Sequence, residues 1–407
     1  MSFRTKPGLS GSAAVSALYR AEIFGHRIRG RCPKIWNSSL SLISANKAEW
    51  SDTIAAMHVL HVVGARPNFL KAAPVIRALS KWPVQQTLTH TGQHYDPALS
   101  DIFFAQLNMP DPDVNLEVGS GSHAWQTAEV MRRFEPVLLE RKPDIVVVYG
   151  DVNSTVAAAL VCAKLNIRLA HVEAGLRSFD RTMPEEINRI VTDQLTDVLF
   201  TPSEDADINL QHEGIPKERI FRVGNVMIDS LVRLLPAAMQ CARNGLPERY
   251  ALVTLHRPSN VDDSASLRRI LTSLLEVNDA LEVIFPAHPR TRQRIEQFGI
   301  DTGKLHLMEP LPYIEFLSLQ SHATVLITDS GGIQEETTYL GVPCLTLRSN
   351  TERPVTVTLG TNVLIGQDLG RLSSELEIIL DGKAKKGSIP PLWDGNSGKR
   401  IAEILHA

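Results

Sequence analysis

Short apolar runs rich in β-branched residues recur along the chain from His58 onward, and longer stretches suited to helices separate them. This alternation is typical of βαβ units, which build parallel sheets covered by helices. The runs are apolar throughout, as expected for strands that are buried on both faces. We therefore predict strands within the segments 58–64, 144–150, 168–175, 197–203, 219–225, 250–256, 281–288, 324–332 and 343–348.

The length of 407 residues exceeds the size at which one hydrophobic core stops growing, so we expect two domains. We place them at residues 57–224 and 225–389, and we expect residues 390–407 to form a helix that returns to the first domain. Nearly every apolar run ends in Gly, Asp, Ser, His or Arg. Ligands bind outside the carboxyl ends of strands in open α/β sheets, so two facing sheets would form a polar ligand cleft.

Composition excludes several classes of partner. The formal net charge of −3 gives no reason to expect nucleic acid or an anionic membrane. No apolar stretch approaches the roughly 18 residues of a membrane helix. The four cysteines form no CxxC pair, which favours a reducing compartment and a cytoplasmic protein.

Residues 1–56 differ from the rest, because they are rich in arginine and serine and poor in acidic residues. Such a leader is similar to an organellar transit peptide. Alternatively, Met57 directly precedes the first predicted strand and is the true start. We expect this N-terminal extension to be disordered or non-native, and dispensable for folding and activity.

Two segments suit an anionic ligand. The segment 64–79 follows the first strand with a glycine, a proline that opens a helix, and the cations Arg66 and Lys71. It has no GxGxxG pattern, so a dinucleotide site is not supported, and surface charge on a helix is the alternative for Lys71. The segment 328–336 ends a strand and opens a helix at Ser330, Gly331 and Gly332, whose N–H groups suit a phosphate. Ser330 as an ordinary helix cap is the alternative there.

Carboxylates gather at the predicted strand ends. Asp151 and Glu173 each follow a strand, and Glu185 opens the next helix. Carboxylates that converge on one cleft separate their pKa values, so one can hold a proton while another accepts one. Glu336 is placed to contact ribose hydroxyls. Solvated acids at loops and helix starts are the alternative for each residue taken alone.

Two histidines, His256 and His288, end apolar runs beside arginines, and Arg353 supplies a further cation. No HxH or HExxH spacing accompanies them, so we predict no metal site. Phosphate or uracil contact, or a satisfied histidine at a strand end, explains them better.

At these residues the sequence resembles the non-hydrolysing UDP-N-acetylglucosamine 2-epimerases, from about His58 to the C-terminus. The resemblance implies an α/β fold of GT-B type, with two Rossmann-like domains facing across a ligand cleft. The matching motifs, in order, are GxRP (64–67), GQH (92–94), GD (150–151), HVEAGLR (171–177), PEExNR (184–189), GN (224–225), HR (256–257), DSGGIQEE (329–336) and TERP (351–354).

The resemblance also implies residue roles. Catalytic carboxylates would be Asp151, Glu173 and Glu185, and ligand contacts would come from Arg66, Lys71, His256, Ser330, Gly331, Gly332, Glu336 and Arg353. Some bacterial members bind a second UDP-N-acetylglucosamine as activator, which here would involve Gln93, His94, Arg257 and His288. Departures from the family pattern include Asn68 after GxRP and Pro258-Ser259-Asn260 after HR, which leave the sugar substituents open.

The implied reaction inverts carbon 2 by elimination and re-addition of UDP through a 2-acetamidoglucal. It needs a UDP-linked amino sugar and no metal or redox cofactor, and a homodimer is expected. The alternatives are a hydrolysing relative, an epimerase for a related UDP-acetamido sugar, a GT-B glycosyltransferase and a non-catalytic nucleotide-sugar sensor.

Overall fold

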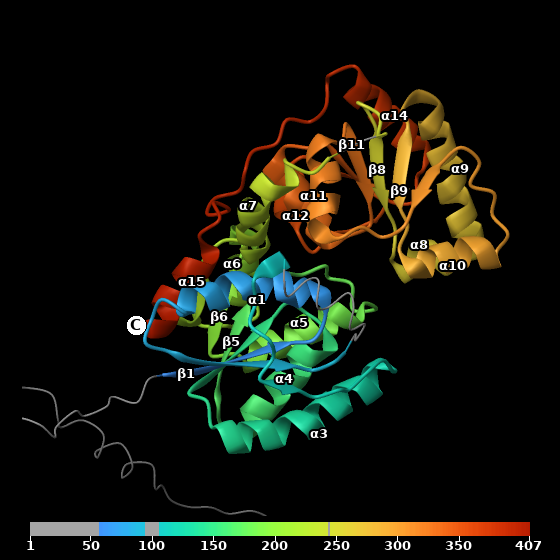
Figure 1. The fold of residues 1–407 in the computed structure, drawn as a ribbon. Coiled ribbons are helices and arrows are strands. Elements are labelled where there is room, and N and C mark those ends of the chain that lie inside the picture. Colours follow the sequence, from blue (N-terminus) through green and yellow to red (C-terminus); the bar gives the residue numbers. More distant parts are fainter. Residues whose placement is uncertain (1–56, 94–105, 243–244) are drawn as a thin grey trace, which may run out of the picture. The chain divides into compact units, whose positions relative to one another are not determined.

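The computed structural model describes residues 57–93, 106–242 and 245–407, so the predicted extension 1–56 lies outside the described residues. Two sheets form in this part of the chain (Figure 1). One has seven strands in the order β3-β2-β1-β4-β5-β6-β7, and the other has six in the order β10-β9-β8-β11-β12-β13. The central pairings β1 with β4 and β8 with β11 are parallel. The predicted α/β class with two parallel sheets is confirmed.

The strands of the first sheet are β1 (His58–Val63), β2 (Gln85–His90), β3 (Val114–Asn115), β4 (Ile145–Tyr149), β5 (Arg168–Val172), β6 (Val198–Thr201) and β7 (Ile220–Arg222). The helices that accompany them are α1 (Arg66–Leu79), α3 (His123–Arg141), α4 (Asn153–Leu165), α5 (Pro184–Leu195), α6 (Glu204–His212) and α7 (Val226–Ala238).

The strands of the second sheet are β8 (Ala251–Thr254), β9 (Val283–Pro286), β10 (His306–Met308), β11 (Val325–Thr328), β12 (Cys344–Thr346) and β13 (Asn362–Leu364). Its helices are α8 (Pro258–Val261), α9 (Ser264–Ala280), α10 (Pro289–Gln297), α11 (Tyr313–His322), α12 (Gly331–Leu340), α13 (Pro354–Thr358) and α14 (Gly370–Leu380). Helix α15 (Ser397–His406) follows them and belongs with the first sheet. No helix among the described residues is long and apolar enough to cross a membrane.

All the predicted strand segments contain a strand, but β2, β3, β10 and β13 were not predicted. β2 reads QQTLTH, which lacks the continuous apolar run of the central strands. The other three have only two or three residues each and lie at sheet edges. Short edge strands carry too little buried surface to leave a clear hydrophobic pattern.

Successive residues of β1 point to opposite faces of the first sheet. Val59 and Val63 join the apolar cluster with α1 and α7, whereas Leu60 and Val62 join the cluster with α3 and α4. Figure 1 shows α1 on one side of this sheet and α3 and α4 on the other. Helices on both faces explain why β1 carries apolar residues that point to either side of the sheet.

The last helix, α15, packs against α1 and α7. Asp229 of α7 accepts hydrogen bonds from the backbone N–H groups of Ser397 (3.0 Å) and Gly398 (2.7 Å) and so caps α15. The buried indole of Trp393 donates to the carbonyl of Pro202 at 2.9 Å. Residues from the end of the chain therefore complete the cover of the first sheet.

The junction before α7 depends on Gly224, which has a φ of +88° and packs against the carbonyl of Leu392. A side chain here would both strain the backbone and collide with a peptide group. We expect Gly224→Ala to lower the free energy of unfolding by about 2–4 kcal/mol in denaturant titrations. Gly341→Ala is the matched control, because Gly341 has a φ of +74° with nothing within 4 Å of an added methyl group. That control should lose only about 1 kcal/mol, and equal losses in both variants would refute the steric explanation.

Candidate active site

A cavity of about 720 Å³ lies at the carboxyl ends of strands from both sheets. Most of the predicted site residues line it: Arg66, Lys71, Asp151, Glu185, His256, Arg257, Ser330, Gly331, Gly332, Glu336 and Arg353. A cleft with convergent polar groups is the default candidate for a ligand site. The cavity lies at the strand ends because the carboxyl ends of all strands in a parallel sheet meet at one edge of that sheet.

Glu173 lies beneath this cavity, buried directly after β5. Its carboxylate is ion-paired with Lys71 of α1, and it accepts a hydrogen bond from Arg353 Nη2 at 2.6 Å. The backbone of Glu173 has a φ of +77°, a conformation that costs energy for a residue with a side chain. Such strain persists only where the surrounding structure holds the backbone in place. Here the strained conformation places the carboxylate of Glu173 between two cations.

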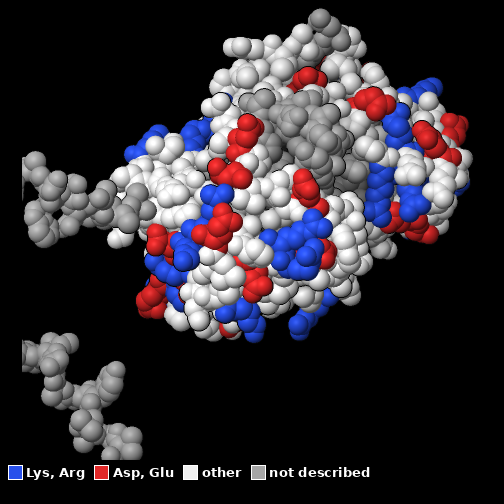
Figure 2. Space-filling view, turned by 60° about the horizontal axis from the view of Figure 1, so that its bottom comes forward, with Lys and Arg blue, Asp and Glu red and all other residues white. Residues whose placement is uncertain are grey.

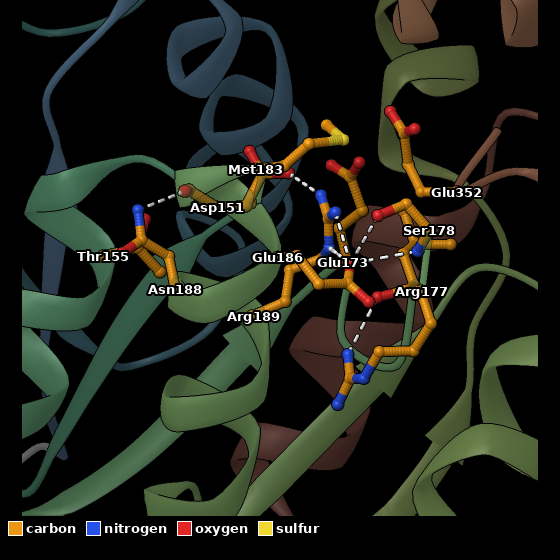
Figure 3. Close-up of polar contacts among 12 residues, drawn as sticks. Asp151, Thr155, Glu173, Arg177, Ser178, Met183, Glu186, Asn188, Arg189 and Glu352 are labelled. Atoms are coloured by element: carbon orange, nitrogen blue, oxygen red, sulfur yellow. Dashed lines mark hydrogen bonds and ion pairs between the residues drawn. The ribbon is translucent and has the colours of Figure 1, made fainter. Parts of the chain in front are cut away.

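Asp151 directly follows Gly150 at the end of β4, and its carboxylate accepts a hydrogen bond from Arg189 of α5 (Figure 3). Although burial acts to raise the pKa of Asp151, the charges of Arg189 and Lys71 hold it below the usual value. Asn188 also donates to the backbone carbonyl of Asp151 at 2.9 Å. Asp151 is therefore an ionised carboxylate at neutral pH, held by two residues of the PEExNR motif.

The two glutamates at the start of α5 face different ways. Glu185 lines the cavity, whereas Glu186 is buried and accepts hydrogen bonds from the backbone of Ser178 (3.0 Å) and Phe179 (2.9 Å). Glu186 also pairs with Arg189 at 2.6 Å. Only the first glutamate of the pair is thus available to a ligand, and the second shapes the loop between β5 and α5.

Ser330, Gly331 and Gly332 open α12 at the cavity wall. The hydroxyl of Ser330 makes no capping bond to this helix, which argues against the ordinary helix cap considered for it. The guanidinium of Arg353 lies where a side chain on Gly331 would be, so a glycine is needed for this approach. A helix N-terminus, a free hydroxyl and a cation together suit a phosphate group.

Comparison with known proteins agrees with this architecture. The family model for UDP-N-acetylglucosamine 2-epimerase matches residues 77–406. The chain is 44% identical over 358 residues to the UDP-N-acetylglucosamine 2-epimerase of Methanocaldococcus jannaschii, covering 84% of this chain and 97% of the relative. The chain belongs to the UDP-N-acetylglucosamine 2-epimerase family.

Solved structures of this family have the same fold. The Methanocaldococcus jannaschii enzyme in complex with UDP-GlcNAc and UDP aligns with a TM-score of 0.81 at 44% identity, over 86% of this chain and 99% of that one. The Neisseria meningitidis enzyme bound to UDP-GlcNAc gives 0.78 at 32% identity, over 86% and 100%. A relative with another substrate is nearly as similar: the UDP-2,3-diacetamido-2,3-dideoxy-D-glucuronate 2-epimerase of Pseudomonas aeruginosa is 41% identical, over 86% of this chain and 99% of its own length.

In this family member, the HR motif is held by Asp329 at the end of β11. The buried carboxylate accepts hydrogen bonds from the N–H groups of His256 (3.2 Å) and Arg257 (3.0 Å) and from the amide of Asn260 (3.0 Å). Burial acts to raise the pKa of Asp329, but contacts led by that with His256 lower it. Asn260, which follows the departure at Pro258 and Ser259, is thus a further anchor for the loop.

The residues predicted for a second nucleotide site are not all brought together. Gln93 is buried and accepts a hydrogen bond from Ser154 Oγ at 2.8 Å, and it does not line the large cavity. His288 lies with its ring centroid 6.4 Å from that of His256 and lines a smaller adjoining pocket. Arg257 lines the main cavity, and His94 lies outside the described residues. An activating site at these residues stays a prediction.

Sequence reasoning missed a buried network beneath the carboxylates. His171 of β5 bridges the carbonyl of Gly150 (2.8 Å) and the carboxylate of Asp193 (2.7 Å), which also lies 2.8 Å from Arg177. Burial acts to raise the pKa of Asp193, but His171 and Arg177 hold it low. The network fixes the peptide before Asp151. Its signal in the sequence was that His171 interrupts the apolar run of β5, whereas Asp193 lies in the largely polar sequence of α5 and leaves none.

No group of three or more His, Cys, Asp or Glu side chains in the described ranges is arranged to hold a metal ion.

On the face drawn in Figure 2, lysines and arginines are interspersed with aspartates and glutamates. The ion pairs of Glu173, Glu352 and Arg353, in contrast, are buried at the cavity.

Proposed function

We propose that this protein interconverts UDP-N-acetylglucosamine and UDP-N-acetylmannosamine without net hydrolysis. The observation that carries the proposal is one cavity with the ionised Asp151 on one wall and the α12 N-terminus with Arg353 on the other. The names of the curated relatives and the UDP-sugar complexes of two solved relatives support this substrate class. The same cavity thus offers Asp151 as a proton acceptor and the α12 N-terminus with Arg353 as a site for the departing diphosphate.

The proposed chemistry begins at carbon 1 of the sugar, because no carbonyl acidifies the hydrogen on carbon 2. Loosening of the carbon 1–oxygen bond moves its electron pair to UDP and makes the neighbouring hydrogen acidic. A carboxylate removes that proton, which leaves a 2-acetamidoglucal and UDP. UDP then adds back to carbon 1 while carbon 2 gains a proton on the opposite face, which inverts it.

Asp151 and Glu173 are the proposed proton-transfer groups, with Glu185 assisting at the cavity wall. Lys71 and Arg353, which pair with Glu173, are also among the cations that line the cavity. A bound diphosphate would share these cations and free Glu173 for proton transfer. Hydrogen-bond donors aimed at developing charge contribute roughly 3–4 kcal/mol each to rate acceleration.

Proton NMR with UDP-N-acetylglucosamine in heavy water tests the proposal directly. We expect UDP-N-acetylmannosamine with deuterium at carbon 2, because the proton added on the second face comes from exchanged solvent. The oxygen that bridges carbon 1 and phosphorus should also scramble in labelled substrate. Product with its original hydrogen and no bridging-oxygen exchange would rule out elimination and re-addition.

The same assay separates the alternatives. Free N-acetylmannosamine would indicate a hydrolysing enzyme, and sugar transfer to an added acceptor would indicate a glycosyltransferase. The relative from Pseudomonas aeruginosa makes the UDP-2,3-diacetamido uronate the second substrate to test. Turnover of that sugar alone would assign the protein to the related reaction. A cytoplasmic location and a homodimer stay predictions.

The phosphate site predicts weaker nucleotide binding in two variants. Arg66→Ala should raise the Kd for UDP roughly 10- to 100-fold, because a charge-assisted hydrogen bond contributes about 1.5–3 kcal/mol. Ser330→Ala should raise it about 3- to 10-fold through loss of one neutral hydrogen bond. Isothermal titration calorimetry measures both. Lys383→Ala is the control, since Lys383 is exposed and pairs only locally with Asp381; unchanged affinity in both site variants would remove the proposed site.

A further inference from the structure

Glu335 is a buried carboxyl of the cavity wall to which no role has yet been given. It lies one turn after Gly331 on α12, with 1% of the residue exposed. Its Oε1 atom is 2.9 Å from Nε of Arg353. Its Oε2 atom is buried and has no hydrogen-bond partner among the described residues. A buried carboxylate with only one partner is poorly compensated.

Arg353 is shared among three carboxylates. Besides Glu335, its guanidinium contacts Glu173 at 2.6 Å and is ion-paired with Glu352. The same guanidinium packs against Gly331, where the proposed phosphate site begins. A diphosphate that binds Arg353 must therefore compete with carboxylates that already hold it.

The two ion-paired networks at the cavity carry no surplus positive charge to neutralise that ligand, and Arg66 and Glu185, which also line the cavity, carry opposite charges. One ion-paired network joins the carboxylates of Glu173, Glu335 and Glu352 to the cations Lys71, Arg257, Arg348 and Arg353. A second network pairs the single cation Arg189 with Asp151 and Glu186. The positive and negative charges of the two networks cancel when all are ionised. The two negative charges of a diphosphate then favour protonation of the least stabilised carboxylate.

That carboxylate is Glu335. Burial raises the pKa of Glu335 to about 7. The positive charge of Arg353 lowers this pKa, and the negative charge of Glu173 raises it further. The charge of Lys71 also lowers it. Helices α7 and α11 pack against α12, and each carries an acidic residue. The carboxylate of Asp229 on α7 accepts hydrogen bonds from α15, and Glu315 on α11 is exposed to solvent.

The other buried carboxyls near Arg353 and on α12 differ from Glu335. Although burial opposes the effect, Arg353 and Arg348 hold the pKa of Glu352 far below its ordinary value. Burial raises the pKa of Glu336 to about 7 as well. Its Oε1 atom, however, accepts a hydrogen bond from Tyr313 at 2.6 Å, and it has no ion pair with Arg353.

We propose that Glu335 takes up a proton from solvent when the diphosphate of a UDP-sugar binds. Arg353 thereby loses its ion pair with this carboxylate and forms one with a phosphate. The proton adds to the Glu335 carboxylate, and the ion pair with Arg353 is exchanged for one between Arg353 and the diphosphate. Glu335 is thus a positioning residue that acts through Arg353. The inference rests on the proposed function, because it requires a UDP-sugar in this cavity.

Calorimetric titration of UDP-N-acetylglucosamine in two buffers with different ionisation enthalpies measures the proton uptake. The sugar nucleotide is the probe because its phosphates stay ionised, whereas the terminal phosphate of UDP titrates near pH 6 itself, as other phosphate monoesters do. The wild type should take up roughly 0.5–0.75 proton per bound ligand at about pH 7.5. Uptake should vanish towards about pH 5.5, where Glu335 is already protonated.

Glu335→Gln should bind the ligand with almost no proton uptake at either pH, because it cannot titrate. Glu335→Asp keeps a carboxyl and should restore part of the uptake, which separates titration from a packing defect. Glu336→Gln should retain the uptake even if its affinity is lower. Wild-type binding without uptake, or uptake that persists in Glu335→Gln and disappears in Glu336→Gln, would overturn the inference. Absence of any binding or epimerisation in the wild type would instead contradict the proposed function.

Discussion

Epimerisation by Asp151→Asn should fall by about two to four orders of magnitude while UDP still binds. The amide keeps the shape of the carboxylate but cannot accept the proton from carbon 2. Arg189 retains Glu186 as its partner, so the local fold should survive. Glu173→Gln should give a loss of similar size, because it removes the second proposed proton-transfer group. Initial rates from NMR and UDP titration calorimetry on the same preparations measure both effects.

A matched control for this prediction is Asp113→Asn. Asp113 is an acid near the edge of the same sheet, where it accepts a hydrogen bond from the backbone of Leu88 and lies outside the main cavity. Its turnover should stay within about threefold of the wild type, since it meets no substrate. Normal turnover with ordinary deuterium incorporation in Asp151→Asn and Glu173→Gln would mean that these carboxylates are not the proton-transfer groups.

The largest stability effect is expected at Arg353. Arg353→Met removes the shared cation and leaves Glu173, Glu335 and Glu352 buried without it. Breaking a buried ion pair from one side costs about 3–5 kcal/mol, because an uncompensated charge remains. Denaturant unfolding at about pH 8 should show a loss of this size. The loss should shrink as the pH falls below 7, since Glu335, whose pKa is raised to about 7, then becomes neutral.

Arg371→Met provides the comparison for Arg353→Met. Arg371 is exposed on α14 and pairs with Glu375 one turn away at 3.2 Å. Exposed pairs of this kind contribute about 0.3–0.5 kcal/mol, so this variant should unfold almost like the wild type. A loss at Arg353 no larger than at Arg371 would show that the buried carboxylates rearrange or protonate without cost.

The central strands and the ligand-facing residues were predictable because each leaves a local pattern. β4 and β11 are continuous apolar runs, and Asp151 and Ser330 follow such runs within one or two residues. β2 was missed because it reads QQTLTH, in which Leu88 is the one apolar residue. Sequence periodicity therefore revealed the buried middle of each sheet and the edge strand β7, but missed β2 and the other three edge strands.

Pairings across long sequence separations could not be predicted from local patterns. The contact between Glu173 and Arg353 joins residues 180 positions apart, and that between Tyr313 and Glu336 joins two helices. The raised pKa of Glu335 depends on burial and on three charges from different elements. Helix α7 is a further case, because it packs against both α1 and α11 just after the predicted boundary at residue 224. The proposed domain limits therefore divide a continuous apolar cluster.

The position of α15 has a consequence for synthesis on the ribosome. Domains usually fold in the order in which they emerge, with the N-terminal one first. Here Gly398 packs against Pro74, and Ile401 and Ala402 belong to the same apolar cluster as Val59 and Phe69. The first sheet is made before the second, yet the face of α1 that packs against α15 lacks this cover until residues 397–406 leave the ribosome. Part of the apolar cluster around α1 can therefore be completed only after the second sheet has been translated.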